Sequence, residues 1–105
     1  MANLKTLILD ENRLESLEEN MFSDMKNLQT LSLRGNELSK LDPKSFVGLE
    51  NLIHLDLREN KLRNLDVHMF DNLPKIEEID LSENSILNKE EILNHYKDSK
   101  IKFTF

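Results

Sequence analysis

The sequence repeats one spacing of apolar residues every 24 positions, and this period restricts the chain to a repeat architecture. The register aligns eight columns, more than chance would produce. Apolar residues open the copies at Leu4, Leu28, Leu52 and Ile76. Two further apolar columns contain Leu7, Leu31, Leu55 and Ile79, and then Leu9, Leu33, Leu57 and Leu81. An asparagine column follows at Asn12, Asn36, Asn60 and Asn84. We therefore predict repeats at about residues 4–27, 28–51, 52–75 and 76–88.

The pattern L-x-x-L-x-L-x-x-N-x-L-x-x-L-x-x-x-x-F-x-x-L resembles the leucine-rich repeat family in its typical 24-residue class. The resemblance covers about residues 4–88. It implies an α/β solenoid with a curved parallel sheet of four repeat strands on the concave side. Loops and short helical turns, which we expect at residues 43–46 and 68–70, would form the convex side.

Two columns are interpreted as structural. A carboxamide carries both donors and an acceptor, so a stack of asparagines can satisfy backbone groups where each coil turns. Phenylalanines at Phe22, Phe46 and Phe70 are expected to fill the convex side of the core. The alternatives are asparagines that bind a ligand or carry glycans, and a cofactor pocket around the phenylalanines. We favour the structural interpretation of both columns.

The fourth copy departs from the pattern after Ile86, where a C-terminal cap at residues 89–105 is predicted. Asn88 with Glu91 three residues later is typical of a helix start, so a helix is expected over 89–96. Residues 100–105 then alternate between polar and apolar, which predicts a fifth parallel strand. Ile101 and Phe103 follow Ile79 and Leu81 by 22 residues, close to the repeat spacing. This ending resembles the cap of cysteine-poor members of the family, and the whole chain, 1–105, is predicted to be one domain.

Composition excludes several classes of function. The formal net charge of −6 opposes sequence-independent binding of nucleic acid, which requires a basic surface. The absence of cysteine excludes disulfide scaffolds, thiol nucleophiles and cysteine-ligated zinc. No N-glycosylation acceptor, signal peptide or apolar membrane span is recognisable, so membrane insertion is not expected. These absences favour a cytosolic or otherwise unsecreted protein.

Side chains that alternate with the buried leucines should face the concave surface in rows. The rows are Thr6, Thr30, His54 and Glu78; Ile8, Ser32, Asp56 and Asp80; Asp10, Arg34, Arg58 and Ser82; and Glu11, Gly35, Glu59 and Glu83. We predict that a partner contacts Thr30, Ser32, Arg34, His54, Asp56, Arg58, Glu78 and Asp80. Arg34 and Arg58 are neighbours whose planar guanidinium groups could hold an acidic partner. In the alternative, Arg58 pairs with Asp56 or Asp80 within the sheet.

Catalytic, metal and cofactor sites are not expected. Ser32, His54 and Asp56 come closest to a nucleophilic triad, but a flat sheet offers no oxyanion pocket and does not exclude water. The one neighbourhood with several metal ligands contains His54, Asp56, Glu78 and Asp80, and no calcium-loop motif accompanies it. His68 and His95 are interpreted as plain surface residues on the convex side and the cap helix.

The favoured function is a non-catalytic scaffold that binds a protein partner of unknown identity through its concave face. The alternative is a structural unit that oligomerises, for example as a homodimer, through its first repeat. Terminal repeats normally need a polar outer face, and here the end is apolar. The residues concerned are Leu4, Leu7, Leu9 and Leu14. An apolar end is also compatible with a fragment of a longer protein or with fraying.

Overall fold

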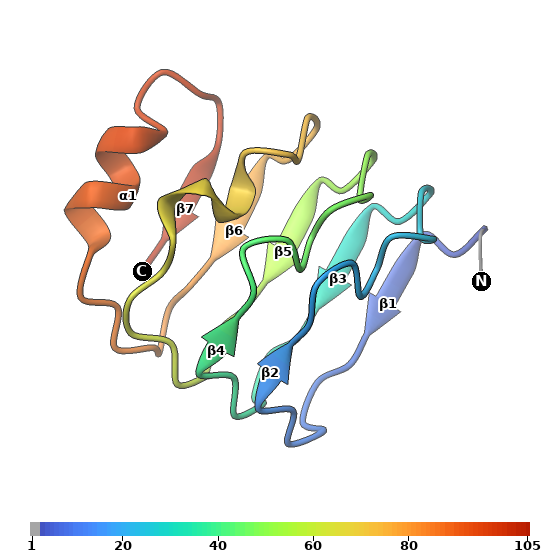
Figure 1. The fold of residues 1–105 in the computed structure, drawn as a ribbon, viewed down its shortest axis with the longest axis horizontal. Coiled ribbons are helices and arrows are strands. Elements are labelled where there is room, and N and C mark those ends of the chain that lie inside the picture. The colour runs from blue at the N-terminus through green and yellow to red at the C-terminus, as the bar shows by residue number, and fades with distance from the viewer. Residues whose placement is uncertain (1–2) are drawn as a thin grey trace.

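Each 24-residue copy begins with a short strand, as the leucine columns predicted. In the computed structural model, which describes residues 3–105, the strands β1 (Thr6–Ile8), β3 (Thr30–Ser32), β5 (His54–Asp56), β6 (Glu78–Asp80) and β7 (Lys102–Thr104) form one sheet. Their order is β1-β3-β5-β6-β7, and all neighbours are parallel. Figure 1 shows the strands side by side in a row from the N-terminal to the C-terminal end. The predicted solenoid, including its fifth strand, is confirmed.

The register of β7 differs from the sequence prediction by two residues. Leu55 pairs with Ile79, and Ile79 pairs with Phe103 rather than with Ile101. Since side chains alternate with a period of two, both registers turn the same residues inward. Phe103 is preferred at this position because its ring lies 5.9 Å from Phe70 and 5.5 Å from Tyr96, measured between centroids.

The core is a continuous stack of leucines closed on the convex side by phenylalanines. The inward leucines of the second copy, Leu28, Leu31, Leu33 and Leu38, are completely buried. Phe22, Phe46 and Phe70 stack in a column with centroid separations of 6.4 and 6.2 Å. The structural interpretation of the phenylalanine column is confirmed. Each fully buried leucine or phenylalanine contributes roughly 1.5–3 kcal/mol of transfer free energy.

The asparagine column satisfies the backbone between coils, as predicted. The Asn36 side-chain amide donates to the carbonyls of Leu9 and Leu33, while its oxygen accepts from the Asn12 and Leu14 N–H groups. Asn60 repeats three of these contacts one coil later, with the Leu33 and Leu57 carbonyls and the Leu38 N–H. Because each carboxamide bonds to the preceding coil as well as to its own, the column fixes the stacking of the coils.

The convex side carries less helix than predicted and one unpredicted pair of strands. η1 (Val67–Phe70) is a 3-10 helix at the expected place. Residues 43–46 form hydrogen-bonded turns instead, in which the Asp42 carboxylate accepts from the Lys44 N–H. β2 (Ser16–Leu17) and β4 (Lys40–Leu41) form a separate parallel pair, which Figure 1 shows away from the main sheet.

The C-terminal cap contains α1 (Lys89–His95), which begins where the sequence predicted and buries Ile92 completely. Asn88 lies at the N-cap, but its side chain does not cap the helix. Its oxygen accepts from the Leu65 N–H, and its amide donates to the Leu65 carbonyl and to Glu91. The predicted helix start at Asn88 is therefore confirmed, although this side chain bonds to the preceding coil and to the Glu91 carboxylate rather than to the backbone of the first turn. No helix within residues 3–105 is long and apolar enough to cross a membrane.

Candidate functional site

Two of the four predicted rows lie on the strands of the main sheet. Strand pairing aligns Thr6, Thr30, His54 and Glu78, and it adds Lys102 at the end of this row. The second row contains Ile8, Ser32, Asp56 and Asp80, followed by Thr104. The sheet therefore holds these side chains at the spacing of adjacent strands, about 4.8 Å.

The fourth predicted row lies in a turn beyond the strands. Glu11, Gly35, Glu59 and Glu83 have φ between 56° and 69°, the left-handed conformation in which glycine is most easily accommodated. The chain turns away from the sheet at this column in each of the four copies. The sequence suggested this only through the single glycine at position 35.

The Arg58 guanidinium is paired within the sheet. Its Nη2 lies 2.9 Å from Asp56 Oδ2, and its Nε donates to Asp56 Oδ1 at 3.0 Å. Asp80 Oδ2 lies 3.6 Å from the same Nε. The hydrogen bond to Asp56, with the negative charge of that carboxylate, raises the pKa of Arg58 above its ordinary value. The alternative from the sequence analysis, in which Arg58 pairs with Asp56 or Asp80 within the sheet, is therefore confirmed.

Arg34 is held more loosely and is 45% exposed along its side chain. Its Nε lies 3.6 Å from Glu59 Oε2. Its backbone N–H donates to Asp10 Oδ1, which also accepts from the Ser32 hydroxyl at 2.6 Å. Ser32 is only 9% exposed, so this predicted contact residue supports its neighbours rather than offering a free hydroxyl.

The triad-like and metal-like groupings on the concave face are not assembled for chemistry. The Ser32 hydroxyl donates to Asp10, and the Asp56 carboxylate binds Arg58. His54 Nδ1 lies 3.6 Å from Glu78 Oε1, with both side chains about half exposed. This arrangement presents charged groups to a partner but does not orient a nucleophile.

The first coil has an incompletely covered apolar face. The residues predicted for self-association, Leu4, Leu7, Leu9 and Leu14, are partly buried against the core, whereas their counterparts one copy later are fully buried. On the concave side of the same coil, Ile8 is 63% exposed. The first coil therefore exposes apolar side chains at positions that are buried in the second coil.

A second cluster of titratable groups, which the sequence interpretation missed, lies where η1 meets α1. His68 Nδ1 is 2.8 Å from Asp71 Oδ2, and His95 Nε2 is 3.0 Å from Asp71 Oδ1. The two imidazole rings meet edge to face with centroids 4.9 Å apart. Asp71 and His95 are 24 residues apart, so the repeat register already placed them in one column. Because the leucine pattern ends after Ile86, the sequence analysis did not extend the register to His95.

Tyr96 fixes the Asp71 carboxylate from the other side. Its hydroxyl lies 2.8 Å from Asp71 Oδ1, also bonds to the Val67 carbonyl, and accepts from the Phe70 N–H. Burial opposes ionisation of Asp71, but hydrogen bonds from His68, His95 and Tyr96 outweigh it and lower the pKa of this carboxyl. The hydrogen bond to Asp71 also raises the pKa of His68.

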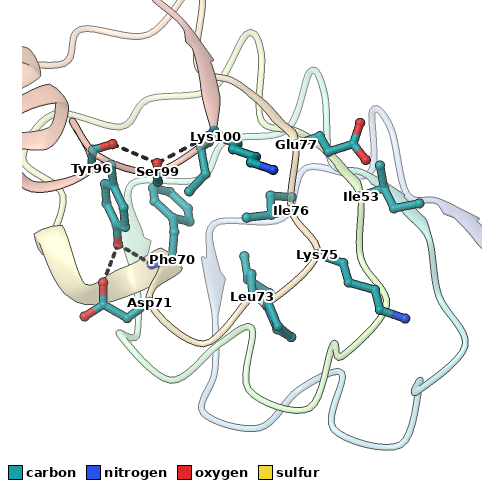
Figure 2. A pocket seen from close by; sticks show the side chains of 12 residues that line it. Ile53, Phe70, Asp71, Leu73, Lys75, Ile76, Glu77, Tyr96, Ser99 and Lys100 are labelled. Atoms are coloured by element: carbon teal, nitrogen blue, oxygen red, sulfur yellow. Dashed lines mark hydrogen bonds between the residues drawn. The ribbon is translucent and has the colours of Figure 1, made fainter.

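A pocket of about 600 Å³ adjoins this cluster. It lies between residues 73–77, which lead into β6, and residues 99–101, which lead into β7. Figure 2 shows Tyr96 and Asp71 at one end, with Leu73 and Ile76 along the wall. Lys75, Glu77 and Lys100 add charged side chains to its lining.

The sequence matches the family model described as Leucine rich repeat over residues 2–62 and again over residues 30–86. A solved leucine-rich repeat protein of Leptospira interrogans is similar, with a TM-score of 0.81 and 28% identity over 97% of this chain and 25% of that chain. TLR13, solved in a complex with ssRNA13, has a TM-score of 0.75 and 25% identity over 96% of this chain and 18% of that chain. The chain spans a quarter or less of the length of these solved relatives. No curated protein matches the sequence.

Proposed function

Because this chain belongs to the leucine-rich repeat family, whose members generally act as non-enzymatic scaffolds for protein–protein interaction, we propose that it binds a protein through its concave sheet. The observation that carries the proposal is the exposed polar surface held across β3, β5 and β6. The side chains that a partner can reach there are Thr30, Arg34, His54, Arg58 and Glu78. On the same face, the Asp56 carboxylate holds Arg58, and the Ser32 hydroxyl is already bonded to Asp10.

Arg34 is the proposed anchor of the surface. Arg58 is already bound to Asp56, whereas the nearest carboxylate oxygen of Arg34 lies 3.6 Å away. A partner carboxylate can therefore form the short, bidentate contact that Glu59 does not make. Ile8, exposed on β1, supplies an apolar contact. We accordingly expect a partner surface that presents a carboxylate beside an apolar side chain.

RNA is the other partner class raised by the comparisons, since TLR13 was solved with ssRNA13. The charge of this chain favours protein. Its formal net charge is −6, and the C-terminal part of the concave region carries Glu78, Asp80 and Glu83. A polyanion would be repelled by these carboxylates.

The test begins with a displayed library of random peptides selected against the immobilised chain. Dissociation constants of enriched peptides are then measured for the wild type, Arg34→Glu and Lys61→Glu. Lys61 is the matched control, because it pairs with Glu37 of the preceding coil at 3.4 Å and lies outside the main sheet. We expect at least about tenfold weaker binding for Arg34→Glu, since an interfacial charge reversal costs more than 1.4 kcal/mol. Equal affinities for all three proteins would contradict the proposal.

Self-association through the first coil is a second candidate, favoured by the partial exposure of Leu4, Leu7, Leu9 and Leu14. Exposed apolar patches of this kind commonly form interfaces. Light scattering across a range of protein concentrations measures the molar mass in solution and so tests self-association directly. A mass that rises from 12.4 kDa towards twice that value supports the candidate, and a constant 12.4 kDa excludes it.

A further inference from the structure

We propose that His68, Asp71 and His95 bind a divalent transition-metal ion of the zinc class, which fastens the cap helix α1 to the last regular coil. Among residues 3–105, these three side chains form the group of histidine and carboxylate ligands that converges closely enough for one ion. The site is separate from the proposed protein-binding face.

The distances suit one ion. The ligand atoms all lie within 4.8 Å of one another. Zinc binds imidazole nitrogen at about 2.0–2.1 Å and carboxylate oxygen at about 2.0–2.2 Å, so two ligands of one tetrahedral ion lie roughly 3.4 Å apart. All three side chains reach solvent, with His68 67% exposed, and can make the small adjustment required.

The ligand chemistry selects the class of metal. Two imidazoles and one carboxylate are the ligand set of many zinc sites with three protein ligands, which leave a fourth position for water. Calcium and magnesium prefer oxygen ligands, and this cluster offers only one carboxylate. The ion would take the place of the protons that now join each imidazole to Asp71.

The surrounding contacts hold the ligands in place. The Tyr96 hydroxyl bonds to Asp71 Oδ1, the kind of outer contact that orients a metal-binding carboxylate. Asp66 caps η1 by accepting from the His68 N–H, and His95 packs edge to face on Tyr96 with centroids 4.7 Å apart. An ion bound here joins η1 to the last turn of α1, so it should stabilise the native cap.

The experiment is a calorimetric titration of the whole chain with ZnCl₂ in excess Mg²⁺, which occupies non-specific acidic positions. We expect one ion per wild-type chain. His68→Gln and His95→Gln should each bind at least about 100-fold more weakly, because removing a ligand exceeds the 10- to 100-fold effect of outer contacts. His54→Gln is the matched control, since His54 also faces a carboxylate at 3.6 Å, and it should bind as the wild type does.

A thermal melt supplies a second readout. Zinc should raise the unfolding midpoint of the wild type and of His54→Gln, and leave those of the two cluster variants unchanged, because only an ion that binds the native state stabilises it. Should a glutamine variant fail to fold, imidazole NMR of the wild type answers the same question: shifts confined to His68 and His95 support the site. Absence of binding to the wild type, or equal binding by all four proteins, would overturn the proposal.

Discussion

At the residue scale, Asn60 shows how one side chain joins two coils. It is 8% exposed, and its amide donates to the carbonyls of Leu33 and Leu57 while its oxygen accepts from the Leu38 N–H. We predict that Asn60→Ala lowers the free energy of unfolding by about 2–4 kcal/mol, because it leaves several buried backbone groups without partners. Asn12→Ala is the control: its exposed amide makes one long bond to the Asp10 carbonyl, so we expect a loss below about 0.5 kcal/mol in urea denaturation.

Replacing each of the two glycines by alanine should lower the free energy of unfolding by a different amount. A Cβ on Gly48, where φ is 96°, would lie 2.7 Å from Ser23 Cα, so backbone would have to move. A Cβ on Gly35 would meet the flexible Glu11 side chain at 3.1 Å. We predict a loss of more than about 2 kcal/mol for Gly48→Ala and about 1 kcal/mol for Gly35→Ala. Equal urea midpoints for the two variants would show that the approach of the coils at Ser23 is not what requires Gly48.

At the element scale, the C-terminal cap depends on one tyrosine. Burial, together with the hydrogen bond to Asp71, raises the pKa of Tyr96 above its usual 10.0. The unfolded chain therefore loses this proton before the folded chain does, and the stability that depends on it is complete below pH 10 and falls as the pH rises further. We predict that the wild type, measured by urea unfolding with a chelator present, loses more stability between about pH 8 and 11 than Tyr96→Phe does. Tyr96 is the only tyrosine, so its absorbance reports ionisation directly; a normal titration in the folded protein would contradict the prediction.

The C-terminal cap also shows which features of helices and strands the sequence could predict and which it could not. The helix start was predicted from Asn88 with Glu91 three residues later, and the fifth strand from the alternation of polar and apolar residues over 100–105. The β7 register was not, since Ile101 and Phe103 alternate identically and only the rings of Phe70 and Tyr96 distinguish them. The β2–β4 pair was also missed: each strand has only two residues, too few for a pattern.

At the scale of the whole molecule, the candidate sites were predictable in proportion to how strictly they follow the 24-residue register. The concave rows follow this register, so the sequence predicted the correct residues for the two rows that lie on the strands. The sequence offered Asp56 or Asp80 as a partner of Arg58, but it could not distinguish the two arginines. Arg58 has a short bidentate contact and Arg34 only a long one, a difference that depends on side-chain placement. The His68–Asp71–His95 cluster combines one register pair with a histidine from η1, and it required the turn of η1 to bring the third ligand close.

Because each coil contacts only its neighbours, we propose that residues 1–105 behave as one domain whose stability falls towards the first coil. Leu55 is 2% exposed between two coils, whereas its counterpart Leu7 is only partly buried in the first coil. We predict that Leu55→Ala lowers the free energy of unfolding by about 2–5 kcal/mol and Leu7→Ala by clearly less. Both values come from denaturant unfolding at a protein concentration where light scattering gives a monomer. Equal losses would mean that another surface covers Leu7 in solution, and in that case the self-association candidate would gain support over an exposed first coil.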